Sequence, residues 1–465
     1  MKNIFLIDRG CTIIDSIMEI EDLFISVLVV DSKEIKEKIL SKYKDRIGHV
    51  YITGYTTYDD FFTEIASDYN LTYDDINNYI IAHHKTYRHL HREILDHSEI
   101  DYRYYLSLRF WLGIFEKYRI DILFSMSVEH GILHDSIPFE IAKNKGIQVY
   151  INTIMFWTPK EKAYSIFHLN KNSYILLDEF SANKTNISNY IHNPNSIIKL
   201  NQHNKLKINK NFIKEQIKKL RPKHFSSESQ NKYFNVFNLS DQFIKKYIKE
   251  LQKLKKFYNK NTLNNYNPNV KYIYYSLHFE PEGAILNRVT LSNQLFIIRI
   301  LSENLPDGWK LFVKEHPNQF SIYEKYPYYL NGINYFKTEQ FYLNIIRNKN
   351  TYLIDLKINS QKLITNACAV ATINGTVAIE SISINKPVLL FGGNSTIFCL
   401  INDVFNINSI SSLKNALCKI NSEFIPSYDN CDEIMSKYLY ETNDIPSNEN
   451  KLFIKELCTL LLKEK

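Results

Sequence analysis

Residues 312–320 read FVKEHPNQF and place a lysine and a histidine directly after an apolar run. If that run is a buried strand, Lys314 and His316 lie at its carboxyl end, where open α/β sheets bind ligands. A lysine and a histidine there can hold a phosphate or diphosphate and stabilise a leaving nucleotide. The alternative is that His316 only caps the turn before Pro317.

Residues 371–393 read ATINGTVAIESISINKPVLLFGG, which predicts a strand, a tight turn, a helix and a second strand. Gly375 allows the backbone to approach a ligand closely, and Thr376 opens a helix whose free N–H groups form an anion site. Glu380 lies one helical turn later and can accept hydrogen bonds from ribose hydroxyls. The alternative is a plain strand–helix joint in which Gly375 is a hinge.

Residues 274–283 read YYSLHFEPEG, so a third predicted strand also ends in polar side chains. His278 and Glu282 are candidate contacts to a sugar donor. A solvated loop without a role is an equally open interpretation of these two residues.

The loop 125–147 crowds titratable residues between a predicted strand and a predicted helix: Glu129, His130, His134 and Asp135. A transferase needs a base or a carboxylate nucleophile, so Asp135, Glu129 and His130 are the candidate catalytic residues. Helix capping by Asp135 or the following serine is the alternative. No cluster has metal-ligand spacing, and we expect neither a metal nor a cofactor.

Strands and helices alternate through both halves of the 465-residue chain, which predicts the α/β class. The polar segment 259–270 indicates a boundary between an N-terminal domain, 1–265, and a C-terminal domain, 266–465. Two doubly wound domains facing a central cleft are the expected architecture. A C-terminal helix at about 450–462 is expected to pack back on the first domain.

Charge is unevenly distributed along the chain. The formal net charge is +7, but residues 201–260 hold 16 basic and 4 acidic residues, an excess of +12 that leaves −5 elsewhere. This basic helical segment, about 197–260, suits an anionic membrane surface or another polyanion. Solvated helix faces are the alternative. No nucleic-acid module accompanies the charge, so nucleic acid is not an expected partner.

Neither an apolar signal core nor a run long enough to span a bilayer is evident in the sequence. The six cysteines include no CxxC pair and have no regular spacing. We therefore expect reduced thiols in a cytoplasmic protein.

Three segments in this order resemble the bacterial capsule polysaccharide biosynthesis family: SLHFEPEG, LPDGWKLFVKEHP and ITNACAVATINGTVAIESISINKPVLLFG. The resemblance covers about residues 271–393, and the family includes Kdo (3-deoxy-manno-octulosonate) transferases. It implies a GT-B fold of two Rossmann-like domains, with a nucleotide-sugar donor in the C-terminal domain and an acceptor on the N-terminal domain. The donor contacts that it implies are Lys314, His316, Thr376 and Glu380. The segment NSTIFCL after LLFGG lacks the aromatic residue that the family pattern would place there.

The expected function is a glycosyltransferase that moves a sugar from a nucleotide donor to a bacterial surface glycan or glycolipid. The most specific expectation is a CMP-linked 3-deoxy-ulosonic acid such as Kdo. The alternatives are a CDP-polyol phosphotransferase, a nucleotide-sugar 2-epimerase and a non-catalytic subunit of a capsule assembly complex. The expected location is the cytoplasm, with peripheral attachment to the inner face of the membrane.

Overall fold

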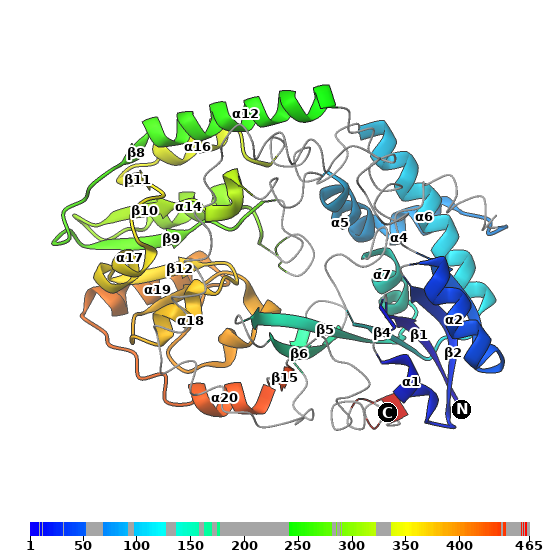
Figure 1. The fold of residues 1–465 in the computed structure, drawn as a ribbon. Helices are drawn as coiled ribbons and strands as arrows, with labels where there is room; N and C mark the ends of the chain where they lie inside the picture. Colours follow the sequence, from blue (N-terminus) through cyan, green and yellow to red (C-terminus); the bar gives the residue numbers. More distant parts are fainter. Residues whose placement is uncertain are drawn as a thin grey trace. The chain divides into compact units, whose positions relative to one another are not determined.

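The computed structural model describes residues 1–52, 68–91, 97–126, 136–157, 162–169, 174–176, 241–280, 291–321, 336–438 and 440–442, except a few single positions, and isolated residues at 285, 289, 457, 459, 461 and 462. The chain forms two compact units. Among the described residues, unit 1 takes those within 1–185 and 437–465, and unit 2 takes those within 241–436. Figure 1 shows the two units with their labelled elements.

Unit 1 contains a sheet with a parallel centre. Its strand order is β15-β6-β5-β4-β1-β2-β3, with β7 paired to β6. The pairs among β4, β1, β2 and β3 and the β4–β5 pair are parallel, whereas β6 pairs antiparallel with β5, β7 and β15. The strands are β1 (Lys2–Ile7), β2 (Leu23–Val30), β3 (Ile47–Ile52), β4 (Ile122–Ser125), β5 (Gln148–Trp157), β6 (Lys162–Leu169), β7 (Tyr174–Leu176) and β15 (Tyr440–Thr442).

Helices cover both faces of the unit 1 sheet, because the side chains that its central strands present to each face are apolar. Phe5 and Ile7 of β1 pack in one apolar cluster with α5, α6 and α7. Ile4 and Leu6 pack in a second cluster with α1, α2 and Leu457. The described helices are α1 (Ile14–Met18), α2 (Lys33–Tyr43), η1 (Lys44–Arg46), α4 (Tyr73–Asn78), α5 (Ile80–Leu90), α6 (His97–Lys117) and α7 (Ser136–Asn144).

Unit 2 contains a sheet in which every recorded strand pair is parallel. The strand order β14-β13-β12-β9-β10-β11-β8 is the Rossmann order, read from β9 as the first strand, with β8 added at one edge. The strands are β8 (Thr262–Leu263), β9 (Tyr272–Ser276), β10 (Lys310–Lys314), β11 (Thr351–Ile354), β12 (Ala369–Thr372), β13 (Val388–Leu390) and β14 (Phe405–Asn406).

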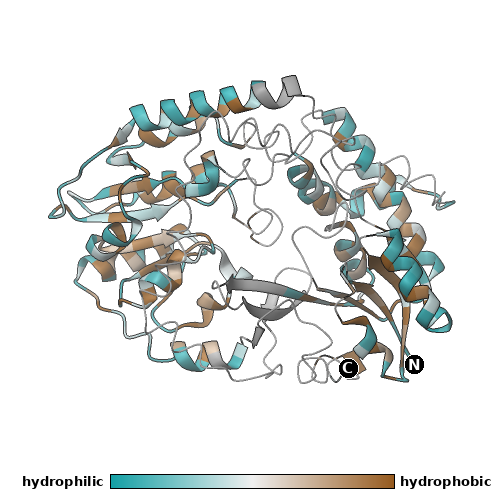
Figure 2. Cartoon of the chain, in the orientation of Figure 1, coloured by the Kyte–Doolittle hydropathy of each residue, from teal (hydrophilic) through white to brown (hydrophobic). Residues whose placement is uncertain are grey.

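The long helix α12 (Asp241–Lys260) belongs to unit 2 and contacts α16. It buries Ile248, Leu251, Leu254 and Tyr258, and its outer face is hydrophilic (Figure 2). The other described helices of unit 2 are α14 (Gln294–Glu303), η3 (Pro317–Phe320), α16 (Glu339–Ile346), α17 (Ser360–Asn366), α18 (Val377–Ile382), η6 (Gly393–Ser395), η7 (Ile397–Leu400), α19 (Ile410–Asn421) and α20 (Cys431–Tyr438).

The predicted α/β class with two Rossmann-like sheets is confirmed. The basic helix 241–260, expected in the first domain, clusters with unit 2, and its Tyr258 hydroxyl donates to the carbonyl of Ile354 in β11. Leu457 and Leu461 from the expected C-terminal helix pack in the core of unit 1. No helix in the described part of the chain is long and apolar enough to cross a membrane.

Candidate functional site

The strand order of unit 2 reverses between β9 and β12, so the loops that follow these strands leave the sheet on opposite sides. Ligands of such sheets bind at this point, outside the carboxyl ends of the strands. Six of the seven predicted donor-binding residues lie along this edge, and we call them the carboxyl-edge cluster: His278, Lys314, His316, Gly375, Thr376 and Glu380. The seventh, Glu282, lies outside the described residues.

His278 connects the ends of β9 and β12. Its Nε2 atom lies 3.2 Å from Oγ1 of Thr372 and 3.4 Å from the backbone nitrogen of Asn374. A Cβ atom at Gly375 would lie 2.9 Å from that hydroxyl oxygen and 3.2 Å from Cε1 of His278. Gly375 is therefore required by close approach of its neighbours. Burial, helped by His316 and Lys337, lowers the pKa of His278 to about 3.

His316 does cap the turn that follows it, but with only one ring nitrogen. Its Nδ1 atom accepts the backbone N–H of Asn318 at 3.1 Å, at the start of η3. In the neutral ring, Nε2 then carries the proton and is a donor. Burial, with the charges of Lys337 and Lys314, lowers the pKa of His316 to about 4, so the ring is neutral near pH 7. The capping role and the donor role are thus compatible.

Lys314 ends β10 with its ammonium group held against the loop after β11. Nζ donates to the carbonyl of Ile358 at 2.7 Å and to Oγ of Ser360 at 2.8 Å. Burial lowers the pKa of Lys314 to about 8, opposed by the charges of Asp355 and Glu380. The third ammonium hydrogen has no recorded partner among the described residues, so it can donate to an anion.

Thr376 and Glu380 belong to α18, which follows β12. Thr376 is the exposed N-cap residue, and its side chain makes no capping hydrogen bond. Glu380 is buried and near enough to Lys314 to raise the lysine's pKa. The structure therefore brings a buried carboxylate and a buried ammonium to the same edge of the sheet.

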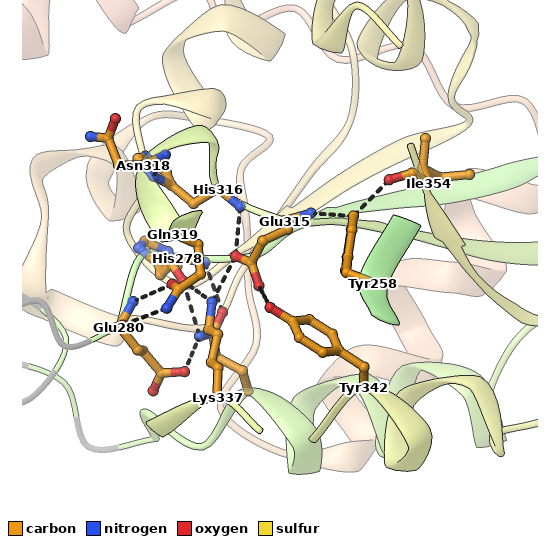
Figure 3. Close-up of polar contacts among 11 residues, drawn as sticks. Tyr258, His278, Glu280, Glu315, His316, Asn318, Gln319, Lys337, Tyr342 and Ile354 are labelled. Carbon is orange, nitrogen blue, oxygen red and sulfur yellow. Dashed lines mark hydrogen bonds and ion pairs between the residues drawn. The ribbon is translucent and has the colours of Figure 1, made fainter. Parts of the chain in front are cut away.

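The cluster is connected to an interaction network whose side chains, except that of Glu315, lie outside the sequence motifs (Figure 3). Glu315 is buried, and its carboxylate accepts from Nζ of Lys337, from the backbone N–H of His316 and from the hydroxyl of Tyr342. The hydroxyl of Tyr258 accepts the backbone N–H of Glu315 at 3.0 Å. Only Glu315 had a sequence signal, since it lies inside the Lys-Glu-His-Pro motif.

Two buried glutamines hold the backbone of the loop after β9. Gln294 accepts the N–H of His278 at 2.8 Å and donates to Oε2 of Glu280 at 2.6 Å. Gln319 accepts the N–H of Glu280 at 3.1 Å and donates to its carbonyl at 2.8 Å. The side-chain amides thus replace strand partners beyond the end of the sheet, as Figure 3 shows for Gln319.

The predicted catalytic residues Asp135, Glu129 and His130 lie outside the described residues. The described flanks are β4, which pairs with β1 where the strand order of unit 1 reverses, and α7, which begins at Ser136. Among the described residues, no group of three His, Cys, Asp or Glu side chains could hold a metal ion.

Two Rossmann-like sheets, one with buried imidazole, ammonium and carboxylate groups at its strand ends, form an architecture that many nucleotide-binding proteins share. Residues 187–398 match the family model described as "Capsule polysaccharide biosynthesis protein". This segment includes the whole carboxyl-edge cluster, and the match confirms the resemblance to the capsule polysaccharide biosynthesis family that the three sequence segments indicate. No curated protein sequence matches the chain.

Several solved structures are weakly similar to this chain. The beta Kdo 2,7 transferase KpsC of Thermosulfurimonas dismutans is 12% identical, with 76% of this chain and 89% of that chain covered and a TM-score of 0.33. UDP-GlcNAc 2-epimerase of Methanocaldococcus jannaschii is 10% identical, with 99% of each chain covered and a TM-score of 0.23. The wall teichoic acid polymerase TagF is 10% identical, with 99% and 88% covered and a TM-score of 0.24.

Proposed function

We propose that the protein is a GT-B-type glycosyltransferase whose unit 2 binds a nucleotide-sugar donor. The observation that carries this proposal is the carboxyl-edge cluster at the reversal of strand order, within the segment that matches the family. The Nε2–H of His316 and the ammonium group of Lys314 are the proposed donors to phosphate oxygens. The backbone at Gly375 and Thr376 adds N–H groups, and Glu380 accepts from the ribose.

These groups suit the charge that develops during glycosyl transfer. An acceptor hydroxyl attacks the anomeric carbon, the bond from that carbon to the phosphate oxygen breaks, and the nucleotide leaves with added negative charge. Lys314 and His316 stabilise that charge from fixed positions. The preferred donor is a CMP-linked 3-deoxy-ulosonic acid such as Kdo, which the motif resemblance favours, and the proposed product is a bacterial surface glycan.

Unit 1 is the proposed acceptor side, with Asp135 as the first choice of base or nucleophile and Glu129 and His130 as the others. The segment that holds them connects β4 to α7, which starts at Ser136. Asp135→Asn keeps the ability to cap a helix but removes the charge. We expect this variant to bind nucleotide normally and to lose transfer by orders of magnitude. A fully active Asp135→Asn protein would contradict the assignment and move it to Glu129, tested as Glu129→Gln.

Helix α12 supports the proposed peripheral attachment to an anionic membrane surface. Five exposed lysines recur every three or four residues on one side of it, and we call them the α12 lysine stripe: Lys246, Lys249, Lys253, Lys256 and Lys260. This spacing puts them on one face of the helix. The buried side chains of α12 lie on the opposite face, so the stripe is free to approach an anionic bilayer.

A thermal-shift panel of CMP, CDP, UMP and UDP tests the proposed function. A nucleotide at about 100 times its dissociation constant adds roughly 2.7 kcal/mol to the free energy of unfolding. We expect CMP to stabilise the protein most and His316→Asn to reduce the shift. Preference for CDP would favour a CDP-polyol phosphotransferase, and preference for UDP an epimerase. Binding of none of the four would contradict the proposal and favour a non-catalytic subunit.

A further inference from the structure

Lys337 is a fully buried cation that joins two strand-end loops of unit 2. Its Nζ atom donates to the carbonyl oxygen of His278 at 2.6 Å and to Oε1 of Glu315 at 2.7 Å. The first acceptor follows β9 and the second follows β10. Figure 3 shows the Lys337 side chain between these two partners.

The carboxylate of Glu315 extends this link toward His316. Its Oε1 atom also accepts the backbone N–H of His316 at 2.6 Å, while Oε2 accepts the hydroxyl of Tyr342 at 2.7 Å. Lys337 is thereby connected to the backbone of both histidines, directly at His278 and through Glu315 at His316. A change at Lys337 therefore reaches both rings.

The charge of Lys337 acts on the same two rings. After burial, Lys337 is the largest cause of the lowered pKa of His316, and it also lowers the pKa of His278. Lys314 also lowers the pKa of His316, and the other titratable groups that interact with Glu315 or with the loop after β9 are Glu280, Tyr258, Tyr275 and Tyr342. With the cation in place, both rings are neutral near pH 7.

We propose that Lys337 is a positioning residue of the donor site. It sets the separation of the loops after β9 and β10, and it determines which ring atoms of His278 and His316 face the donor phosphates. The inference rests on the proposed function only for the identity of the ligand. A purely structural ion pair would stabilise the fold without controlling how the rings meet an anion.

Lys337→Met tests this role, because methionine fills space but removes the charge and both hydrogen bonds. We expect about a tenfold or larger loss of CMP affinity at neutral pH by calorimetry. Without the cation the ring pKa values rise, while burial still lowers them, so CMP binding should strengthen at a higher pH than in the wild type as the pH falls. The ring ¹⁵N signals of His278 and His316, assigned with single His→Asn variants, are expected to titrate at higher pH than in the wild type.

Lys85→Met in unit 1 is the matched control. Lys85 donates to the buried Glu140 at 2.7 Å, so its loss also breaks an ion pair with a buried carboxylate. We expect it to lower the melting temperature while leaving CMP affinity and the two histidine titrations unchanged. The proposal is overturned if Lys337→Met behaves like this control.

Glu315→Gln is the second variant and covers the case in which Lys337→Met does not fold. The amide keeps an acceptor for Lys337 but removes the negative charge that holds it between the two loops, so the ring signals of both histidines should shift relative to the wild type. Unchanged histidine signals in Glu315→Gln overturn the proposal. Because the ring titrations need no nucleotide, they judge Lys337 even if the wild type binds none of the four nucleotides, a result that would contradict only the proposed function.

Discussion

In the sheet of each unit, the strand order reverses next to the first strand. The reversal lies between β1 and β4 in unit 1 and between β9 and β12 in unit 2. In unit 1, the described residue just after β1 is Asp8, which is buried and accepts the N–H of Ile13 at 2.9 Å. In unit 2, the same edge gathers two imidazoles, two ammonium groups and three carboxylates from several elements. The reversal of strand order is thus common to both units, whereas the side chains that gather beside it differ, and function depends on those side chains.

The largest expected effect distinguishes a capping role of His316 from a role in sugar transfer. In His316→Asn, the side-chain oxygen can still accept the N–H of Asn318, but the Nε2–H donor is lost. We expect sugar transfer, assayed with the donor that the nucleotide panel identifies, to fall by about 10²- to 10³-fold with little change in melting temperature. Full activity in this variant would show that His316 only caps the turn. The main difference between the two units would then be lost.

The next effect compares two crowded glycines, one in each unit. A Cβ at Gly375 would lie 2.9 Å from Oγ1 of Thr372, and a Cβ at Gly48 in β3 would lie 2.7 Å from the carbonyl oxygen of Ser26. Both alanine variants should lose about 1–3 kcal/mol of unfolding free energy. Only Gly375→Ala should weaken CMP binding, by about tenfold in calorimetry, because only it displaces His278. Equal affinities in the two variants would argue against a nucleotide site in unit 2.

A smaller effect is the pH dependence that Lys314 gives to nucleotide binding. With its pKa lowered to about 8, the ammonium group is charged below that pH and neutral above it. CMP affinity should therefore decline as the pH rises past about 8, by at most about tenfold per pH unit. In Lys314→Met, affinity should be lower at neutral pH and flat over this range. A wild-type profile as flat as that of the variant would show that Lys314 does not contact the phosphate.

The smallest effect concerns the α12 lysine stripe, with unit 1 again as the control. Lys253 in α12 and Lys38 in α2 are both exposed. One lysine near an anionic leaflet contributes about 1 kcal/mol, so Lys253→Gln should weaken sedimentation with anionic vesicles by about fivefold at low salt. Lys38→Gln should leave it unchanged. Equal losses in both variants would indicate general charge attraction without a role for the stripe.

Short-range signals predicted much of this fold. The residues of β9, β10, β12 and β13 are nearly continuous apolar runs bounded by turn residues, as buried parallel strands require. The four-residue strand β11 was not identified, because TYLI is too short a run for periodicity to assign. The assignment of α12 to unit 2 depends on Tyr258 reaching β11, a tertiary contact without a local signal.

The candidate site shows the same contrast between residues with a local sequence signal and residues placed only by tertiary contacts. Lys314, His316 and Gly375 were identifiable because they stand where a predicted strand ends. Lys337 was not, because its two partners are 22 and 59 residues away in sequence. A buried ion pair between distant segments leaves no spacing pattern, so only the folded chain reveals it. Gln294 and Gln319 were missed for the same reason, since amides that replace backbone partners can come from any nearby helix.

The central claim is that the donor nucleotide binds at the carboxyl edge of the unit 2 sheet, and a crystal structure with bound CMP tests it most directly. The account predicts phosphate oxygens within hydrogen-bond distance of Nε2 of His316 and Nζ of Lys314, beside the backbone of Gly375. Nucleotide bound at the carboxyl edge of the unit 1 sheet, with no contact to these three residues, would contradict it.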